Sequence, residues 1–100
     1  MKKTFLLTHK TIKPARLIDA IKHEVKKYIK RERNKKLPDD ADFWDFDCKY
    51  GHTKEVADVV HMSTLNKCID DAAQHELESF YLEIIAKPAV RTSKPIEDEE

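Results

Sequence analysis

An apolar stripe between residues 14 and 33 constrains the fold of this chain more than any other feature of its sequence. Pro14 has the fixed φ that is favoured at the first position of a helix. Apolar residues then recur at intervals of three and four, as they do on one face of a helix. They are Leu17, Ile18, Ile21, Val25, Tyr28 and Ile29. The stripe predicts a long amphipathic helix that ends before Pro38, because the residue preceding a proline is disfavoured in helical conformation.

Four shorter segments have the composition or the alternation of β-strands. Their apolar side chains alternate with polar ones, or β-branched residues dominate, as is typical of strands with a buried face. The segments are residues 3–8, 43–50, about 57–62 and 80–86. Gly51 is the only glycine of the chain, and its tolerance of positive φ predicts a chain reversal between the second and third strands.

A second helix is predicted between the third and fourth strands. Ser63 is a favourable N-cap, and Leu65, Ile69 and Ala72 follow at helical spacing. The complete order is β-α-β-β-α-β, the split βαβ signature, in which right-handed crossovers place both helices on one face of the sheet. We therefore predict an α+β fold, a two-layer ferredoxin-like plait with a four-stranded antiparallel sheet. The alternative is another α+β sandwich of similar content.

The length of 100 residues is that of a single domain. We expect the domain to cover residues 1–87 and residues 88–100, which are rich in acids and prolines, to form a disordered acidic tail. No apolar run approaches the roughly 18 residues of a membrane span, and the first residues do not resemble a signal peptide. The expected location is cytoplasmic, where Cys48 and Cys68 would be free thiols.

Charge is divided unequally along the chain. Residues 1–36 contain thirteen Lys and Arg against three acids, whereas residues 37–100 contain six against sixteen. This asymmetry indicates either a basic surface for a partner or two halves that face and neutralise each other.

The basic side of the first helix is the best candidate for binding nucleic acid or another polyanion. Lysines and arginines spread over three helical turns can meet successive phosphates and release their counterions. The candidate residues are Lys22, Lys26, Lys27, Lys30, Arg31 and Arg33. The alternative is a solvated helix face that pairs partly with the acidic loop after it.

The face of the sheet that points away from the helices is expected to be acidic. Strand alternation places Asp45, Asp47 and Glu83 on that face, together with Lys49 and one tyrosine, Tyr81. An RNA-recognition plait needs several exposed aromatic side chains and a positive field there. We therefore disfavour RNA binding by the sheet.

The sequence offers little for catalysis or metal binding. Residues 39–47 contain five carboxylates without the ligand order of an EF-hand, and the five histidines show no HxH or HExxH spacing. Cys48 or Cys68 with His52 or His61 is the only available pair of nucleophile and base. We predict no catalytic residue, metal ligand or cofactor, and an enzyme is the less favoured class.

Four stretches of the chain have a distinctive combination of residues. They are residues 13–16, 20–28, 42–49 and 78–81, and the most distinctive piece is Phe43-Trp44-Asp45-Phe46-Asp47-Cys48. Together they resemble a family of short bacterial proteins catalogued only as a domain of unknown function. The resemblance covers most of residues 1–87. It implies a bacterial cytoplasmic protein, and no particular activity or binding residue.

Three hypotheses for the function follow. The first, which we favour, is a non-enzymatic interaction or regulatory domain that binds a protein partner, or itself, through the open sheet face or an edge strand. The second is binding of nucleic acid or another polyanion by the basic helix face. The third is a small metal- or thiol-dependent enzyme. A membrane is not an expected partner.

Overall fold

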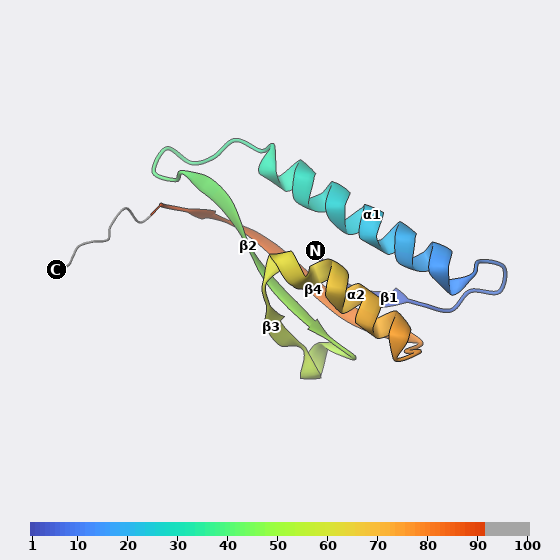
Figure 1. Ribbon diagram of the computed structural model, residues 1–100. Coiled ribbons are helices and arrows are strands. Elements are labelled where there is room, and N and C mark those ends of the chain that lie inside the picture. The colour runs from blue at the N-terminus through green and yellow to red at the C-terminus, as the bar shows by residue number, and fades with distance from the viewer. Residues whose placement is uncertain (92–100) are drawn as a thin grey trace.

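The computed structural model describes residues 1–91, which form four strands, two α-helices and two short 3-10 helices (Figure 1). The elements are β1 (Lys2–Leu6), α1 (Pro14–Arg33), β2 (Phe43–Gly51), η1 (Lys54–Val56), β3 (Asp58–Val60), η2 (Met62–Thr64), α2 (Leu65–Gln74) and β4 (Ser79–Ala89). The α+β class and the order β-α-β-β-α-β are confirmed. Over the described range, neither helix combines the length and the apolar character needed to cross a membrane.

The four strands form one antiparallel sheet in the order β1-β4-β2-β3. Since β4 is antiparallel to both neighbours, β1 and β2 run parallel on its two sides, and β3 and β4 flank β2 in the same way. The sheet therefore contains two interleaved split βαβ units, and both helices cover one of its faces, as predicted (Figure 1). We describe the plait by its strand order rather than as ferredoxin-like, because β4 and β2 are central and β1 lies at an edge.

The core lies between the sheet and the two helices. Its fully buried side chains are Phe80, Ile69, Leu82, Ile84 and Cys48. Three of the five come from β4, because this central strand has a strand on each side and helices over one face. On β2, Phe46 and Cys48 belong to this core, so the predicted alternation is confirmed and Asp45 and Asp47 point to the opposite face.

Gly51 is required by a close approach of two backbone segments. Its φ is not positive, so the reason that the sequence suggested for a glycine here is wrong. A Cβ atom at this position would lie 2.6 Å from Cα and 2.9 Å from the amide nitrogen of Ala57. The chain reverses through η1, and the absent side chain lets the segment before β3 pack directly on the end of β2.

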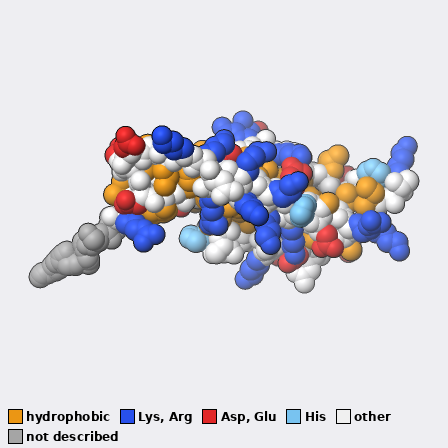
Figure 2. Space-filling model, turned by 90° about the horizontal axis from the view of Figure 1, so that it is seen from above, with side chains coloured by type: hydrophobic (Ala, Val, Ile, Leu, Met, Phe, Trp, Pro, Cys, Tyr) orange, Lys and Arg blue, Asp and Glu red, His pale blue; other side chains and the backbone are white. Residues whose placement is uncertain are grey.

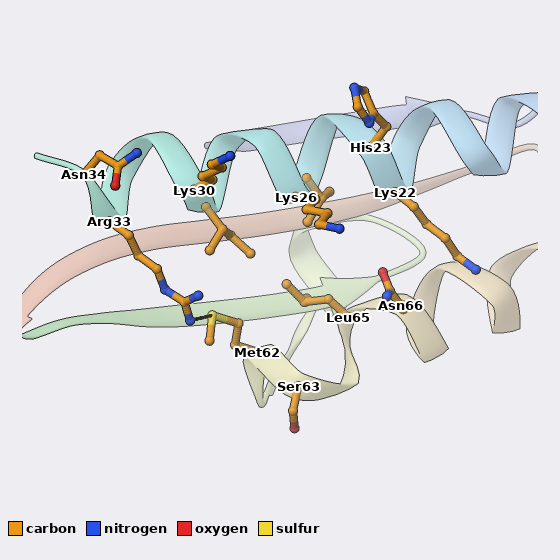
Figure 3. A pocket seen from close by; sticks show the side chains of 12 residues that line it. Lys22, His23, Lys26, Lys30, Arg33, Asn34, Met62, Ser63, Leu65 and Asn66 are labelled. Atoms are coloured by element: carbon orange, nitrogen blue, oxygen red, sulfur yellow. Dashed lines mark hydrogen bonds between the residues drawn. The ribbon is translucent and has the colours of Figure 1, made fainter.

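The chain enters α2 through a 3-10 turn. Ser63 was predicted to cap the helix, but the helix begins at Leu65 after η2. His61 caps η2 instead, because its Nδ1 accepts a hydrogen bond from the Ser63 backbone N–H at 3.1 Å. This turn removes Met62 from the strand in which the sequence placed it and brings it beside α1 (Figure 3).

β4 runs to Ala89, two residues past the domain boundary expected at residue 87. Beyond it, the Arg91 backbone N–H donates to the Asp42 carboxylate at 2.8 Å. The indole of Trp44 donates to the Lys35 carbonyl at 2.9 Å, which ties the loop after α1 to this end of the sheet. Residues 92–100, the rest of the expected tail, lie outside the described residues.

Candidate functional site

An open groove of about 750 Å³ runs between α1 and the segment where η2 leads into α2 (Figure 3). Its charged lining residues all come from α1: Lys22, Lys26, Lys30 and Arg33. We call this feature the basic groove. Figure 2, seen from above relative to Figure 1, shows Lys and Arg side chains spread over this side of the molecule.

Helical spacing explains why these four side chains line one wall. The steps between them are four, four and three residues, and positions so spaced lie on one side of a helix. A step of four residues corresponds to about 6 Å along the helix axis. Lys30 and Arg33 also lie in the last turn of α1, where cations offset the negative end of the helix dipole.

The floor of the groove is apolar. Val25 and Ile29 of α1 contribute to it, and Leu65 and Met62 line the facing wall. Val25 and Leu65 belong to the buried core, so the groove opens where the core reaches the surface. Other polar side chains complete the lining: His23, Asn34, Ser63 and Asn66. A ligand would meet apolar surface at the centre and positive charge along one rim.

The cations at the two ends of the groove have contacts within the domain. The Lys22 ammonium lies 2.6 Å from the Asp70 carboxylate of α2, which joins the helices at one end. At the other end, the Arg33 guanidinium lies 5.6 Å from the centre of the Phe46 ring and donates to the Met62 sulfur at 3.8 Å. These contacts hold both side chains at the rim of the groove.

Lys26 and Lys30 lie between these ends. Among residues 1–91, neither forms an ion pair with a carboxylate. The two ammonium groups belong to the same helix side, one turn apart, so they repel each other. An anion bound between them would replace this repulsion with attraction.

The remaining two predicted residues, Lys27 and Arg31, lie on the other flank of α1. They line a smaller hollow of about 420 Å³ together with Met1 and Tyr28. The Arg31 guanidinium lies 5.4 Å from the centre of the Tyr28 ring and 3.8 Å from the Glu32 carboxylate. The structure therefore divides the six predicted residues into four in the basic groove and two outside it.

The second wall of the groove was not identified from the sequence. Met62, Ser63 and Asn66 line it, but nothing in their local pattern indicates that η2 and the start of α2 pack opposite α1. The contribution of α2 is electrostatic as well as steric, because the positive end of its dipole lies at its N-terminus. Only the packing of the two helices reveals this wall.

The Cys48 thiol offers little nucleophilic reactivity at neutral pH. Both cysteines are free, as predicted. Burial, and to a smaller extent the carboxylates of Asp47 and Asp45, raise the pKa of the Cys48 thiol to about 11. A thiol with a raised pKa is a poor nucleophile at neutral pH. Residues 1–91 also contain no group of three or more His, Cys, Asp and Glu side chains that could hold a metal ion.

The open face of the sheet is balanced in charge, and the expectation of an acidic face is wrong. Register shows why: Lys2 and Lys49 flank Glu83 in neighbouring strands, and Lys87 lies opposite Asp45. The Lys87 ammonium is 2.9 Å from the Asp47 carboxylate. Lys2 and Lys87 lie just outside the strand ranges expected from the sequence, residues 3–8 and 80–86, so the expected face lacked their two positive charges.

One hydrogen bond on this face shifts the pKa values of both partners. The Tyr81 hydroxyl donates to the Glu83 carboxylate at 2.7 Å. The bond raises the pKa of the phenol and lowers the pKa of the carboxyl. It keeps the Tyr81 ring engaged within the sheet rather than free to stack on a ligand.

The fold and the groove together define a small α+β plait domain with a basic groove between its two helices. The chain belongs to the family of unknown function DUF6172, whose profile matches residues 1–95. No curated protein and no solved structure matches the chain. The resemblance to a family of unknown function is thus confirmed, and the family itself assigns no function.

Proposed function

We propose that this domain is a non-enzymatic binding module that takes an acidic segment of a protein partner into the basic groove. The observation that carries the proposal is the position of Lys26 and Lys30, which have no carboxylate partner among residues 1–91 and stand beside an apolar floor. Charged groups beside apolar surface suit a peptide that carries both carboxylates and apolar side chains.

The shape of the site supports a peptide over a nucleic acid. Single-stranded nucleic acids bind to basic surfaces that also present aromatic rings for base stacking, and the lining of the groove contains no Phe, Tyr or Trp side chain. The nearby Phe46 is buried, and Trp44 uses its indole N–H to hold Lys35. The polar lining, with Asn34 and Asn66, can instead donate hydrogen bonds to peptide carbonyls or carboxylates.

Binding of nucleic acid along the outside of α1 is the second candidate. It is favoured by the step of about 6 Å between lysines four residues apart, which is close to the distance between successive phosphates of an extended strand. Lys27 and Arg31 would then continue the contact on the other flank. This candidate uses both sides of α1, whereas the peptide uses only the groove.

A pair of charge-matched variants separates the two candidates. The first carries Lys26→Glu and Lys30→Glu in the groove, and the second carries Lys27→Glu and Arg31→Glu on the other flank. Both change the net charge equally. Fluorescence anisotropy with a labelled peptide of Glu, Asp and Ile measures the affinity at about 0.15 M salt, where the Debye length is about 8 Å.

We expect the groove variant to lose at least about tenfold in affinity for the peptide, since two attractive contacts become repulsive. The flank variant should bind the peptide nearly as well as the unchanged protein. A peptide of Glu alone should bind more weakly than the mixed peptide, because it does not use the apolar floor. Equal losses in the two variants, or no binding by the unchanged protein, would refute the peptide proposal.

The same variants test the nucleic-acid candidate with a labelled oligothymidylate. If the strand follows α1, both variants lose affinity to a similar extent, and log K falls steeply and linearly with log salt concentration. Residues 88 and 89 of the expected tail belong to β4. The bacterial origin, the cytoplasmic location and the disorder of the part of the tail that follows Arg91 remain predictions that accompany this proposal.

A further inference from the structure

We propose that the acidic residues 97–100 of the same chain occupy the basic groove and compete there with an external acidic ligand. The inference rests on the proposed function, because it assigns an internal competitor to the same site. The segment consists of Glu97, Asp98, Glu99 and Glu100, directly preceded by Ile96. It therefore combines carboxylates with an apolar side chain, and the groove offers a partner for each.

The described part of the chain ends on the same side of the molecule as α1. The Arg91 backbone N–H donates a hydrogen bond to the Asp42 carboxylate at 2.8 Å. Trp44, two residues after Asp42, donates a hydrogen bond from its indole to the Lys35 carbonyl at 2.9 Å. Lys35 follows Arg33 by two residues, so β4 ends on the side of the molecule where α1 also ends. When extended, the chain can span up to about 20 Å from Arg91 to Glu97 and up to about 30 Å from Arg91 to Glu100. Two turns of α1 back from Arg33 cover only about 11 Å.

Charge favours the middle of the groove, where Lys26 and Lys30 lie. Lys22 already forms an ion pair with Asp70. The two lysines in the middle are not paired with any carboxylate of residues 1–91. Residues 95–100 contain four acids and no basic residue, so no positive charge within this segment offsets its negative charge. It would approach from the end that Arg33 marks.

Tethering makes even a weak contact effective. A short flexible linker gives an effective concentration on the order of 1 mM. If the segment binds as a free peptide with a Kd of about 0.1 mM, it weakens an external ligand at the same site by about tenfold. Neutralising its charge should therefore strengthen external binding by about this factor.

The test compares three full-length chains. The first is unchanged. The second carries Glu97→Gln, Asp98→Asn, Glu99→Gln and Glu100→Gln. The third, a charge-matched control, neutralises four exposed acids that do not line the groove: Asp39, Asp40, Glu55 and Asp58. Each is titrated with the labelled peptide of Glu, Asp and Ile, and the side-chain amide resonances of Asn34 and Asn66 are recorded by NMR without the peptide.

Two results support the proposal together: about tenfold tighter peptide binding by the second chain alone, and a shift of the two amide resonances in that chain alone. Equal peptide binding by all three chains, with unchanged resonances, overturns the inference and leaves the proposed function intact. If no chain binds the peptide, the proposed function fails. The amide resonances then decide the inference by themselves, because unchanged resonances show that the segment does not occupy the groove.

Discussion

Replacing Gly51 by Ala should destabilise the domain through a single backbone contact. The new Cβ would lie 2.6 Å from the Cα of Ala57, about 1 Å inside an ordinary carbon–carbon contact. Because both sides of the contact are held by backbone, relief requires the segment before β3 to move away from β2. Overpacking of this kind costs about 1–3 kcal/mol, and the reduced freedom of the unfolded chain offsets about 0.4–1 kcal/mol of it. We expect a net loss of roughly 1–2 kcal/mol in the free energy of unfolding.

Urea unfolding followed by the fluorescence of the single tryptophan, Trp44, measures this loss. The melting temperature should fall by about 4–8 °C for each kcal/mol. Gly51→Asn separates close approach from positive φ, because Asn tolerates positive φ better than Ala does. We expect the Asn variant to be no more stable than the Ala variant. A Gly51→Ala protein as stable as the unchanged one, or an Asn variant clearly more stable than the Ala variant, would refute the reasoning.

Two further predictions concern titrating groups. With a thiol pKa of about 11 against an ordinary 9.0, Cys48 carries about 100-fold less thiolate at pH 8. In a Cys68→Ser chain, alkylation by iodoacetamide, followed by mass spectrometry, should be at least this much slower in the folded than in the urea-unfolded protein; similar rates would contradict the burial argument. Tyr81→Phe should raise the pKa of Glu83 measured by NMR titration, because it removes the main cause of the lowered value. Since the folded pKa of Glu83 lies below 4.5, the stabilisation is present above that pH and is lost as the pH falls through the folded value; an unchanged Glu83 pKa in the variant would contradict the role of the Tyr81 hydroxyl.

Local patterns in the sequence predicted the four strands, the two α-helices and the side of β2 that faces the helices. The start of α1 at Pro14 is confirmed. It was predictable because the fixed φ of proline and the spacing of the apolar residues are local properties of the sequence. The inward direction of Phe46 and Cys48 is confirmed, because strand alternation has a period of two wherever the strand is placed. The start of a helix and the facing of a strand depend on residues that are close in the sequence and on each element having one buried side.

The strand order and the second wall of the groove could not be predicted in this way. The order β1-β4-β2-β3 depends on which strand edges meet after the helices have packed, and the same alternation is compatible with several orders. Met62 is a single residue whose position also depends on packing that the local pattern does not determine. Its apolar side chain fits a strand pattern, but the His61 cap turns the chain into η2 and brings Met62 to within 3.8 Å of Arg33.

The unequal lengths of the two helices explain why a groove exists at this place. α1 has twenty residues and α2 has ten, so α2 covers only about half of the length of α1. The Lys22–Asp70 pair near one end and the Arg33–Met62 contact near the other show that the helices run antiparallel. The positive N-terminus of α2 therefore faces the most basic part of α1. Like charges placed together oppose folding, so an anion that binds only the folded domain relieves this repulsion and gains affinity from it.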